Sequence, residues 1–324
     1  MMKKEKPQNL DALIFIDTNI FLDFYRMRKS DVSIKYLQEI ENHKDLIITS
    51  NQVEMEFKKN RQEVILETIS EVKKNVNINL SVPTILSDAR AVENIRKSKK
   101  VIEDQQKRLK LQIERILKNP STNDPVYRSL QKLFNHNSPI NLNRENKVRF
   151  AIRKLALKRF ILGYPPRKKT DNSIGDAINW EWIIKSAGNT GKHIIIVTRD
   201  TDFGAIYDGD SYLNDWLTQE FKQRVSRKRK IIITDKLSLA FQYVDVPVTK
   251  EMIEEEEKVI DLSFLHYKMR TTEEAIRKIN ESIQMTNIQD AISRLNENKN
   301  LYDSIFNKIN FLKGPSSPED KDQK

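Results

Sequence analysis

The sequence predicts an α/β fold, built on a doubly wound parallel sheet of about four or five strands. Short apolar runs that are typical of buried strands lie at residues 14–16, 45–49, 193–198 and 231–235. Segments with helical spacing of apolar residues separate these runs. Strands that alternate with helices favour a parallel sheet, because each connection between neighbouring parallel strands needs a crossover helix.

Composition indicates a helix-rich protein with an anionic partner. A chain of 324 residues is long enough for one large domain or two smaller ones, and 38% hydrophobic with 32% charged residues is typical of long solvated helix faces. The net charge of +11, from 57 Lys and Arg against 46 Asp and Glu, favours nucleic acid as a partner. A generally lysine-rich proteome would give the same excess.

The sequence also excludes several classes of protein. It contains no cysteine, which rules out disulfides and thiolate metal sites. No apolar run approaches the roughly 20 residues that a membrane-spanning helix needs, and the N-terminus MMKKEKPQN lacks the apolar core of a signal peptide. We therefore expect a cytoplasmic protein with no membrane partner.

The first strand stops at a carboxylate. Ile14 to Ile16 are apolar, Asp17, Thr18 and Asn19 interrupt the run, and a second apolar run with helical spacing follows. Because ligands of open α/β sheets bind at the carboxyl ends of the strands, Asp17 is a candidate site residue. Asp17 is equally suited to cap the helix that follows, and the stretch alone does not choose between the two roles.

Two acids follow the second strand. Ser50 or Asn51 can cap a helix that carries Glu54 and Glu56. Residues two apart lie on opposite faces of a helix, so only one of these glutamates can point where Asp17 points.

The segment from 58 to 159 is helical and highly charged, with no further strand candidate of any strength. A repeat every seven residues indicates one long helix that packs a narrow seam, which Pro120 and Pro125 end in a polar loop. The repeat consists of Ile95, Ile102, Leu109 and Ile116. We expect the segment to be a helical insertion that enlarges the core; the alternative is a basic arm that holds substrate.

Further acids follow the insertion. A helix from 149 to 162 stops at Gly163, and the next helix opens with Asp176 in its first turn, where the helix dipole favours an acid. The strand at 193–198 leads into Asp200 and Asp202. Asp235 ends the last strand, and we expect it to cap the helix at 237–243.

The composition changes beyond Pro247. An acidic run occupies 254–257, and apolar residues recur at helical spacing between 273 and 312. We divide the chain into a domain at 1–248, with its insertion at about 67–159, a helical C-terminal region at 249–313, and a disordered tail at 314–324. The C-terminal helices are suited to a homodimer contact or to a protein partner.

The acids share a position relative to the sheet. The carboxyl ends of parallel strands lie at one edge, so Asp17, Glu54 or Glu56, Asp176, Asp200 and Asp202 are expected to converge there. Three or four neighbouring carboxylates do not all stay ionised without a cation. Hard oxygen ligands favour Mg²⁺ or Mn²⁺.

Four segments, in order, resemble the PIN-domain nucleases, and within them a PIN-like branch with a long helical insertion. They are FIDTNIFLDFYR, QVEMEFKKNR, PPRKKTDNSIGDAINWEWII and VTRDTDFG. The resemblance covers roughly residues 11–66 and 160–245. It implies an endonuclease that hydrolyses phosphodiester bonds with one or two Mg²⁺ or Mn²⁺ ions, most often in single-stranded RNA.

The resemblance also implies roles for individual residues. The metal-binding acids match Asp17, Glu56, Asp176 and Asp200, with Glu54 as the alternative to Glu56. Asp202 would replace or assist Asp200. The residues that would orient these ligands, or add a further acid, are Asn19, Asn172, Thr198 and Asp171.

Basic residues near the acids are expected to neutralise phosphates of a bound nucleic acid. They are Arg167, Lys168, Lys169 and Arg199. The basic cluster at 227–230 precedes a strand, so we expect it at the opposite edge of the sheet.

Other functions fit the sequence less well. An aspartyl-phosphate phosphatase would need an acid where Asn19 stands, a P-loop enzyme would need a GxxxxGK[ST] run, and the four histidines show no zinc spacing. A structure-specific DNA nuclease stays open, as does a nuclease-fold protein that binds nucleic acid or a partner without cutting.

Overall fold

The computed structural model describes residues 9–74, 83–86, 89–167 and 173–262. The chain divides into two compact units, 1–259 and 260–324, and almost all described residues belong to the first. The strands are β1 (Ala12–Ile16), β2 (Ile47–Ser50), β3 (Asn141–Leu142), β4 (His193–Val197), β5 (Gly204–Tyr207), β6 (Asp210–Leu213) and β7 (Ile231–Thr234).

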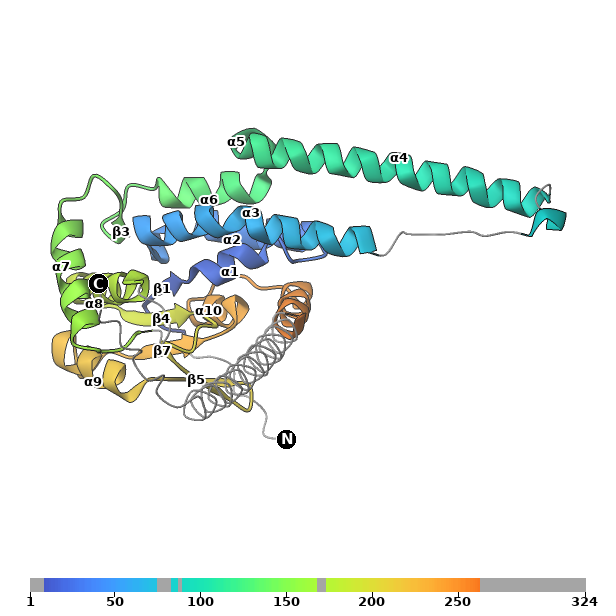
Figure 1. Cartoon of the computed structure of the whole chain (residues 1–324). Coiled ribbons are helices and arrows are strands. Elements are labelled where there is room, and N and C mark those ends of the chain that lie inside the picture. Colours follow the sequence, from blue (N-terminus) through green and yellow to red (C-terminus); the bar gives the residue numbers. More distant parts are fainter. Residues whose placement is uncertain (1–8, 75–82, 87–88, 168–172, 263–324) are drawn as a thin grey trace, which may run out of the picture. The chain divides into compact units, whose positions relative to one another are not determined.

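The helices follow the predicted alternation with the strands (Figure 1). They are α1 (Thr18–Asp23), α2 (Ser30–Asn42), α3 (Asn51–Lys74), α4 (Arg90–Lys118), α5 (Pro120–Asn123), α6 (Pro125–Phe134), α7 (Val148–Ile161), α8 (Gly175–Thr190), α9 (Asp215–Arg224) and α10 (Leu237–Tyr243), with short 3₁₀ helices η1 (Lys44–Leu46) and η2 (Thr84–Leu86). Within the described ranges, none of the helices is both long and apolar enough to cross a membrane.

The predicted parallel sheet is confirmed. Over the described residues it has five strands in the order β3-β2-β1-β4-β7, and every neighbouring pair is parallel. The register pairs Ile14 with Ile47 on one side and with Ile195 on the other, so β1 is the centre of the sheet. The carboxyl ends of β1 and β4 are therefore neighbours, because Ile16 pairs with Val197.

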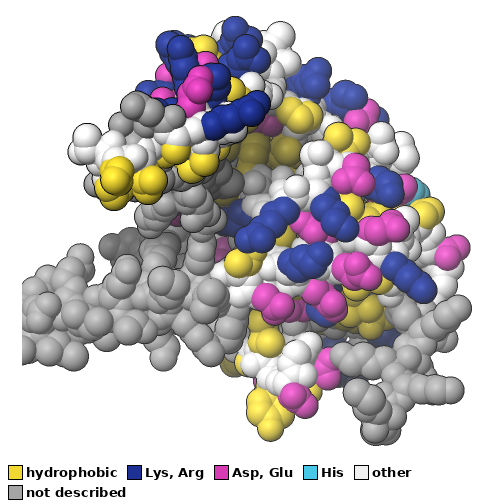
Figure 2. Space-filling view, turned by 90° about the vertical axis from the view of Figure 1, so that its right-hand side faces the viewer, with side chains coloured by type: hydrophobic (Ala, Val, Ile, Leu, Met, Phe, Trp, Pro, Cys, Tyr) yellow, Lys and Arg dark blue, Asp and Glu magenta, His cyan; other side chains and the backbone are white. Residues whose placement is uncertain are grey.

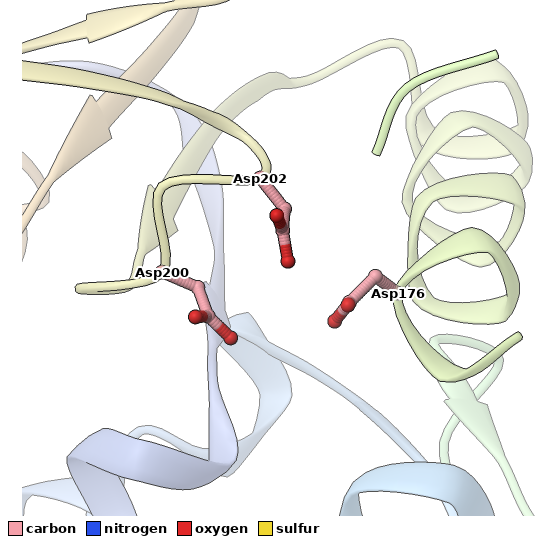
Figure 3. Close-up of side chains that lie close together, drawn as sticks. All are labelled: Asp176, Asp200 and Asp202. Atoms are coloured by element: carbon pink, nitrogen blue, oxygen red, sulfur yellow. The ribbon is translucent and has the colours of Figure 1, made fainter. Parts of the chain in front are cut away.

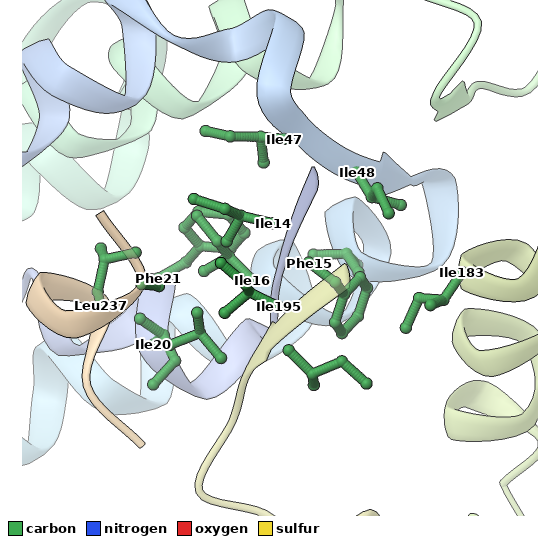
Figure 4. Close-up of a cluster of buried hydrophobic side chains, with 14 of the residues drawn as sticks. Ile14, Phe15, Ile16, Ile20, Phe21, Ile47, Ile48, Ile183, Ile195 and Leu237 are labelled. Atoms are coloured by element: carbon green, nitrogen blue, oxygen red, sulfur yellow. The ribbon is translucent and has the colours of Figure 1, made fainter. Parts of the chain in front are cut away.

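Helices cover both faces of the sheet, and the side chains of β1 alternate between them. Figure 4 shows Ile183 of α8 on the side of Phe15, and Phe21 of α1 with Leu237 of α10 on the side of Ile14. All five side chains are buried. Burying a side chain of this size stabilises the folded state by about 1.5–3 kcal/mol. Packing on both faces therefore holds β1, and the chain that follows it, in place.

Two strand features were not predicted. The segment 58–159 was expected to hold no strand, yet β3 pairs with β2, with Asn141 opposite Thr49. A strand of two residues has no apolar run to reveal it, and the Asn141 side chain holds it by donating to the carbonyls of Phe134 and His136, at 2.8 Å each. The antiparallel hairpin of β5 and β6 was likewise missed.

The insertion enlarges the core only in part. Leu130 and Leu133 of α6 are buried, as is Ile152 of α7, which agrees with the expectation. For α4 the expectation is wrong, because its only buried side chain is Val92. Leu109 of the seven-residue repeat is 49% exposed. Figure 2, in which α4 stays at the top, shows Lys and Arg beside exposed hydrophobic side chains there.

A buried ion pair fastens the end of α4 to the core. Arg61 of α3 donates to Asp124 Oδ2, with Nε at 2.8 Å and Nη2 at 2.5 Å, and to the carbonyl of Ile116 at 3.0 Å. The long helix ends at Lys118, just ahead of Pro120 as expected, but the residues that follow are helical rather than a loop. Pro120 begins α5 and Pro125 begins α6, where a missing N–H costs nothing.

The last described segment is a helix at 250–262. Met252 and Val259 are buried, as are Glu255 and Glu256 of the acidic run. The predicted helical region from 263 to 313, its dimer or partner contacts, and the predicted disordered tail at 314–324 lie outside the described residues.

A candidate metal site at the carboxyl edge of the sheet

Three carboxylates converge beyond the carboxyl end of β4. Asp176 lies in the first turn of α8, and Asp200 and Asp202 lie in the turn between β4 and β5. One oxygen from each lies within 4.8 Å of the other two. Figure 3 shows the three side chains pointing toward one another. All three are partly buried, so their mutual repulsion is only partly screened by water.

Asp17 lies at the carboxyl end of the central strand and is deeply buried. Its Oδ1 accepts a hydrogen bond from the N–H of Thr18 at 2.7 Å, which makes it the cap of α1. Its Oδ2 accepts from Asn19 Nδ2 at 3.0 Å and from Thr198 Oγ1 at 2.6 Å. The structure thus joins the two roles that the sequence left open, because the capping residue is also the acid at the sheet edge.

The raised pKa of Asp17 reflects its burial and the acids around it. The pKa of Asp17 is raised to about 7, first by burial and then by the nearby charges of Asp200 and Glu56, against the hydrogen bonds from Thr198 and Thr18. A cation at the cluster would reverse these repulsions and favour the ionised carboxylate.

Glu56 is the glutamate of α3 that faces Asp17. Its Oε2 accepts from Thr18 Oγ1 at 3.1 Å, and its Oε1 accepts from Gln52 Nε2 at 2.7 Å. Glu54 lies elsewhere on the helix, where it pairs with Lys58 at 2.6 Å. Helix periodicity separates the two glutamates, and the packing of α3 against α1 brings Glu56 to the acids.

Gly175 makes room for Glu56. A Cβ at this position would clash with Glu56 Oε1 and would lie 2.9 Å from Gln52 Nε2. Glycine at this position therefore lets the Glu56 and Gln52 side chains keep their present places against the start of α8.

The donor set fits a hard divalent cation. The convergent ligands are carboxylate oxygens, and Asn19 adds an amide oxygen, Oδ1, that is buried without a hydrogen-bond partner in the described structure. Oxygen ligands of this kind are those that Mg²⁺ and Mn²⁺ prefer. Thr198 orders the site further, because its Oγ1 accepts from the N–H of Asp200 at 3.0 Å while it donates to Asp17.

The predicted phosphate-binding residues differ in exposure and in their contacts. Arg167 is exposed, and its guanidinium lies 4.6 Å from the centre of the Phe160 ring. Arg199 is instead ion-paired with the buried Asp23, so its charge is already engaged within the protein. Lys168 and Lys169 lie outside the described residues, as do Asp171 and Asn172.

The fold is a parallel sheet covered by helices, and the acids at its carboxyl edge offer only oxygen ligands. These two features define the class: an α/β protein with a candidate divalent-cation site. The sequence pattern of the PIN domain matches residues 14–203, more than half of the chain, and the chain belongs to the PIN-domain family. Neither the curated proteins nor the solved structures yielded a match. PIN domains are generally nucleases that use divalent metals and bind nucleic acid, and the acid cluster suits that chemistry.

Sequence reasoning missed three residues that shape the site. Thr18 and Gln52 hold the Glu56 carboxylate, and Gly175 admits it. Only Gly175 left a usable signal, since it stands directly before an acid in a chain with seven glycines. Hydroxyl and amide side chains are too common for their partners to be inferred from position.

Replacing Gly175 tests the contact between α8 and Glu56. We expect Gly175→Ala to displace the Glu56 carboxylate and to weaken Mn²⁺ binding about tenfold, the lower range for disturbed ligand geometry. The stability should change little, because the clashing atoms are the ends of flexible side chains. Calorimetric titration with Mn²⁺ and the Tm measure the two effects.

Gly188→Ala is the matched control on the same helix, because a Cβ there meets nothing within 4 Å. It should leave Mn²⁺ binding unchanged and raise stability by up to about 1 kcal/mol. Equal Mn²⁺ affinities in the two variants would contradict the proposed contact.

The raised pKa of Asp17 predicts a pH-dependent stability of the metal-free protein. Between the unfolded value of 3.8 and the folded value of about 7, the folded chain holds the extra proton, so stability falls as the pH rises through this window. In EDTA we expect a lower Tm at pH 8 than at pH 5.5, with a smaller difference in Asp17→Asn. Identical pH profiles of the two proteins by scanning calorimetry would refute this origin.

Proposed function

We propose that this protein is an endonuclease that hydrolyses phosphodiester bonds in single-stranded RNA, with one or two Mg²⁺ or Mn²⁺ ions as cofactors. The observation that carries the proposal is the convergence of Asp176, Asp200 and Asp202 within 4.8 Å in a PIN domain. The buried Asp17 and the partly buried Glu56 add two more carboxylates near this group, since the charges of Asp200 and Glu56 both act on Asp17.

The residues divide the chemistry between them. Asp176, Asp200 and Asp202 would hold the cation, with Asp17 and Glu56 completing the negative charge around it. A bound divalent cation would lower the pKa of a coordinated water, so that hydroxide could add to phosphorus while the bond to the leaving ribose oxygen breaks. Thr198 and Asn19 keep Asp17 in one orientation through their hydrogen bonds, so the ligands need little rearrangement when substrate binds.

An exposed aromatic pair supports a single-stranded substrate. The rings of Tyr164 and Trp216 lie 5.2 Å apart between centres, and the two residues are 40% and 47% exposed. One backbone hydrogen bond links the segment of Trp216 to the turn that carries the acids: the N–H of Asn214, two residues before Trp216, donates to the carbonyl of Phe203 at 2.9 Å. Phe203 directly follows Asp202.

Exposed aromatic rings stack on unpaired bases, at about 1–3 kcal/mol per base, and cannot do so on a closed duplex. Arg167, which follows the same turn after α7, adds a charge for the phosphates. RNA is preferred to DNA in this proposal because of the resemblance to PIN-type nucleases, and a structure-specific DNA nuclease is the alternative that the cleavage experiment separates.

The first test compares Asp176→Asn and Asp200→Asn with the wild type on end-labelled single-stranded RNA, single-stranded DNA and duplexes. Each is incubated with Mg²⁺, Mn²⁺ or EDTA. We expect cleavage of single-stranded RNA that needs the cation, and a loss of roughly 100-fold or more in each variant, since a lost ligand costs several kcal/mol of barrier.

Asp208→Asn is the control, because Asp208 is an exposed acid at the hairpin tip with a positive φ that asparagine tolerates. Residual activity above about a tenth of wild type in both test variants would refute the assignment of these acids. Cleavage of duplex or DNA substrates alone would identify a DNA nuclease. Binding without any cleavage would identify a non-catalytic member of the family.

A second test concerns the aromatic pair. We expect Trp216→Ala to raise the KM for single-stranded RNA about tenfold, because one stacked base is lost, with kcat nearly unchanged. Phe150→Ala is the control, since Phe150 is 61% exposed near the other end of α7 from Tyr164. An unchanged KM in Trp216→Ala, or an equal rise in Phe150→Ala, would remove the stacking role.

A further inference from the structure

The helix α4 carries a large share of the positive charge of the protein. Its 29 residues include ten Lys and Arg against four Asp and Glu, so α4 accounts for +6 of the net charge of +11. All residues of α4 are described, and among them only Val92 is buried. The helix therefore presents its charge to solvent, and packing in the core explains little of its sequence.

Most of these cations have no acidic partner within the described residues. Lys97 pairs with Glu93 at 2.6 Å and Lys99 with Glu103 at 4.0 Å, both within the helix. The other eight basic side chains of α4 form no ion pair in the part of the chain that the structure describes. Their charges are available to an anionic partner.

A groove on α4 combines two of these unpaired cations with apolar side chains. The groove has a volume of about 380 Å³. Arg108 and Arg115 lie on one face of the helix with Gln112 between them, because residues three or four apart are neighbours on a helix surface. The residues that line the groove are Arg108, Leu111, Gln112, Arg115, Ile116 and Asn123.

The groove lies at the end of α4 that is fixed to the core. Arg61 of α3 donates to the carbonyl of Ile116 at 3.0 Å, and Asn123 Nδ2 donates to the carbonyl of Arg115 at 3.3 Å. The side chains that line the groove therefore stand on a backbone that is held in place. Because α3 also carries Glu56, one helix links the groove to the acids of the candidate metal site.

A second copy of this chain suits α4 poorly as a partner. A coiled coil needs apolar residues at alternating spacings of four and three, and Lys99 and Gln106 occupy two such positions between Ile95 and Leu109. Two helices that each carry a net charge of +6 would also repel one another.

A single strand of nucleic acid uses both kinds of side chain that the groove offers. Guanidinium groups such as those of Arg108 and Arg115 bind phosphates and stack on unpaired bases. Leu111, which is 47% exposed, offers apolar contact to the face of a base. The base faces of a duplex are covered by their neighbours, so a groove of this composition suits an unpaired strand.

We propose that the groove of α4 binds single-stranded nucleic acid, with Arg108 and Arg115 in contact with its phosphates. The inference rests on the proposed function, because it gives the RNA substrate a point of attachment apart from the acid cluster. The helix α4 then has the role that the sequence left as the alternative, a basic arm that holds substrate. Affinity for the strand depends on α4, whereas the chemical step depends on the acids.

The experiment measures binding of fluorescent oligouridylate to the full chain by anisotropy in EDTA, at several salt concentrations. The test variant combines Arg108→Gln with Arg115→Gln. Each phosphate contact on a single strand contributes about 0.7 to the slope of log affinity against log salt, so we expect a slope shallower by about 1.4 and an affinity about tenfold lower at about 0.1 M salt. Both arginines are exposed, so the Tm should not change.

The matched control combines Arg227→Gln with Arg229→Gln. Both arginines are exposed and precede β7, so this variant loses the same charge at the opposite edge of the sheet from the acids. We expect its affinity and its salt slope to stay close to those of the wild type. Equal losses in the two double variants would mean that only the overall charge counts, and would overturn the role of the groove.

A cleavage assay in Mg²⁺ separates this inference from the proposed function. We expect the test variant to raise the KM about tenfold with kcat unchanged, whereas Asp200→Asn should lose cleavage and still bind oligouridylate in EDTA. A wild type that cuts nothing, yet binds oligouridylate more tightly than the test variant, would overturn the proposed function and support the groove.

Three other outcomes count against the groove. An unchanged affinity in the test variant would overturn this inference alone. A wild type that sediments as a dimer, and as a monomer after Leu109→Glu, would assign α4 to a second copy of the chain instead. A wild type that neither binds nor cuts a single strand would overturn the groove and the proposed function together.

Discussion

The structure depends on holding several carboxylates together at one edge of a buried sheet. Asp17 follows the most deeply packed strand, and Asp200 follows its neighbour, so the fold itself brings like charges together. The pKa of Asp17, raised to about 7 by burial and then by Asp200 and Glu56, expresses the cost of this arrangement. Hydrogen bonds from Thr18, Asn19 and Thr198 act against that cost, and the N-terminus of α8 favours the acid at Asp176.

The side chains that contact the acids fix the orientation of the carboxylates but do not neutralise their charge. The carboxylates of Asp17 and Glu56 accept hydrogen bonds from Thr18, Asn19 and Thr198. These three donor side chains are uncharged. Arg199, the cation nearest in sequence, is paired with Asp23. The site therefore gathers acidic side chains at one edge of the sheet, which suits a divalent cation together with a phosphate group.

The additions to the PIN core differ in what they do for it. The helices α6 and α7 extend the hydrophobic core, and the buried pair of Arg61 and Asp124 joins α3 to the start of α6. Breaking such a pair typically costs about 3–5 kcal/mol, so it anchors the insertion firmly. The helix α4 ends at this anchor, yet Ile95 and Leu109 of its apolar repeat are exposed. The helix at 250–262 instead brings two buried glutamates into the core.

The sequence by itself determined the parallel sheet and the acids that follow its strands, because both are local patterns: an apolar run such as Ile194 to Val197, and a carboxylate within a few residues of its end. The tertiary structure decided the features that a local pattern cannot predict. It turned Glu56 rather than Glu54 toward Asp17, formed the two-residue strand at Asn141, left α4 outside the core, and engaged Arg199 with Asp23. These outcomes depend on which distant segments pack together, and periodicity along one segment carries no information about its partner.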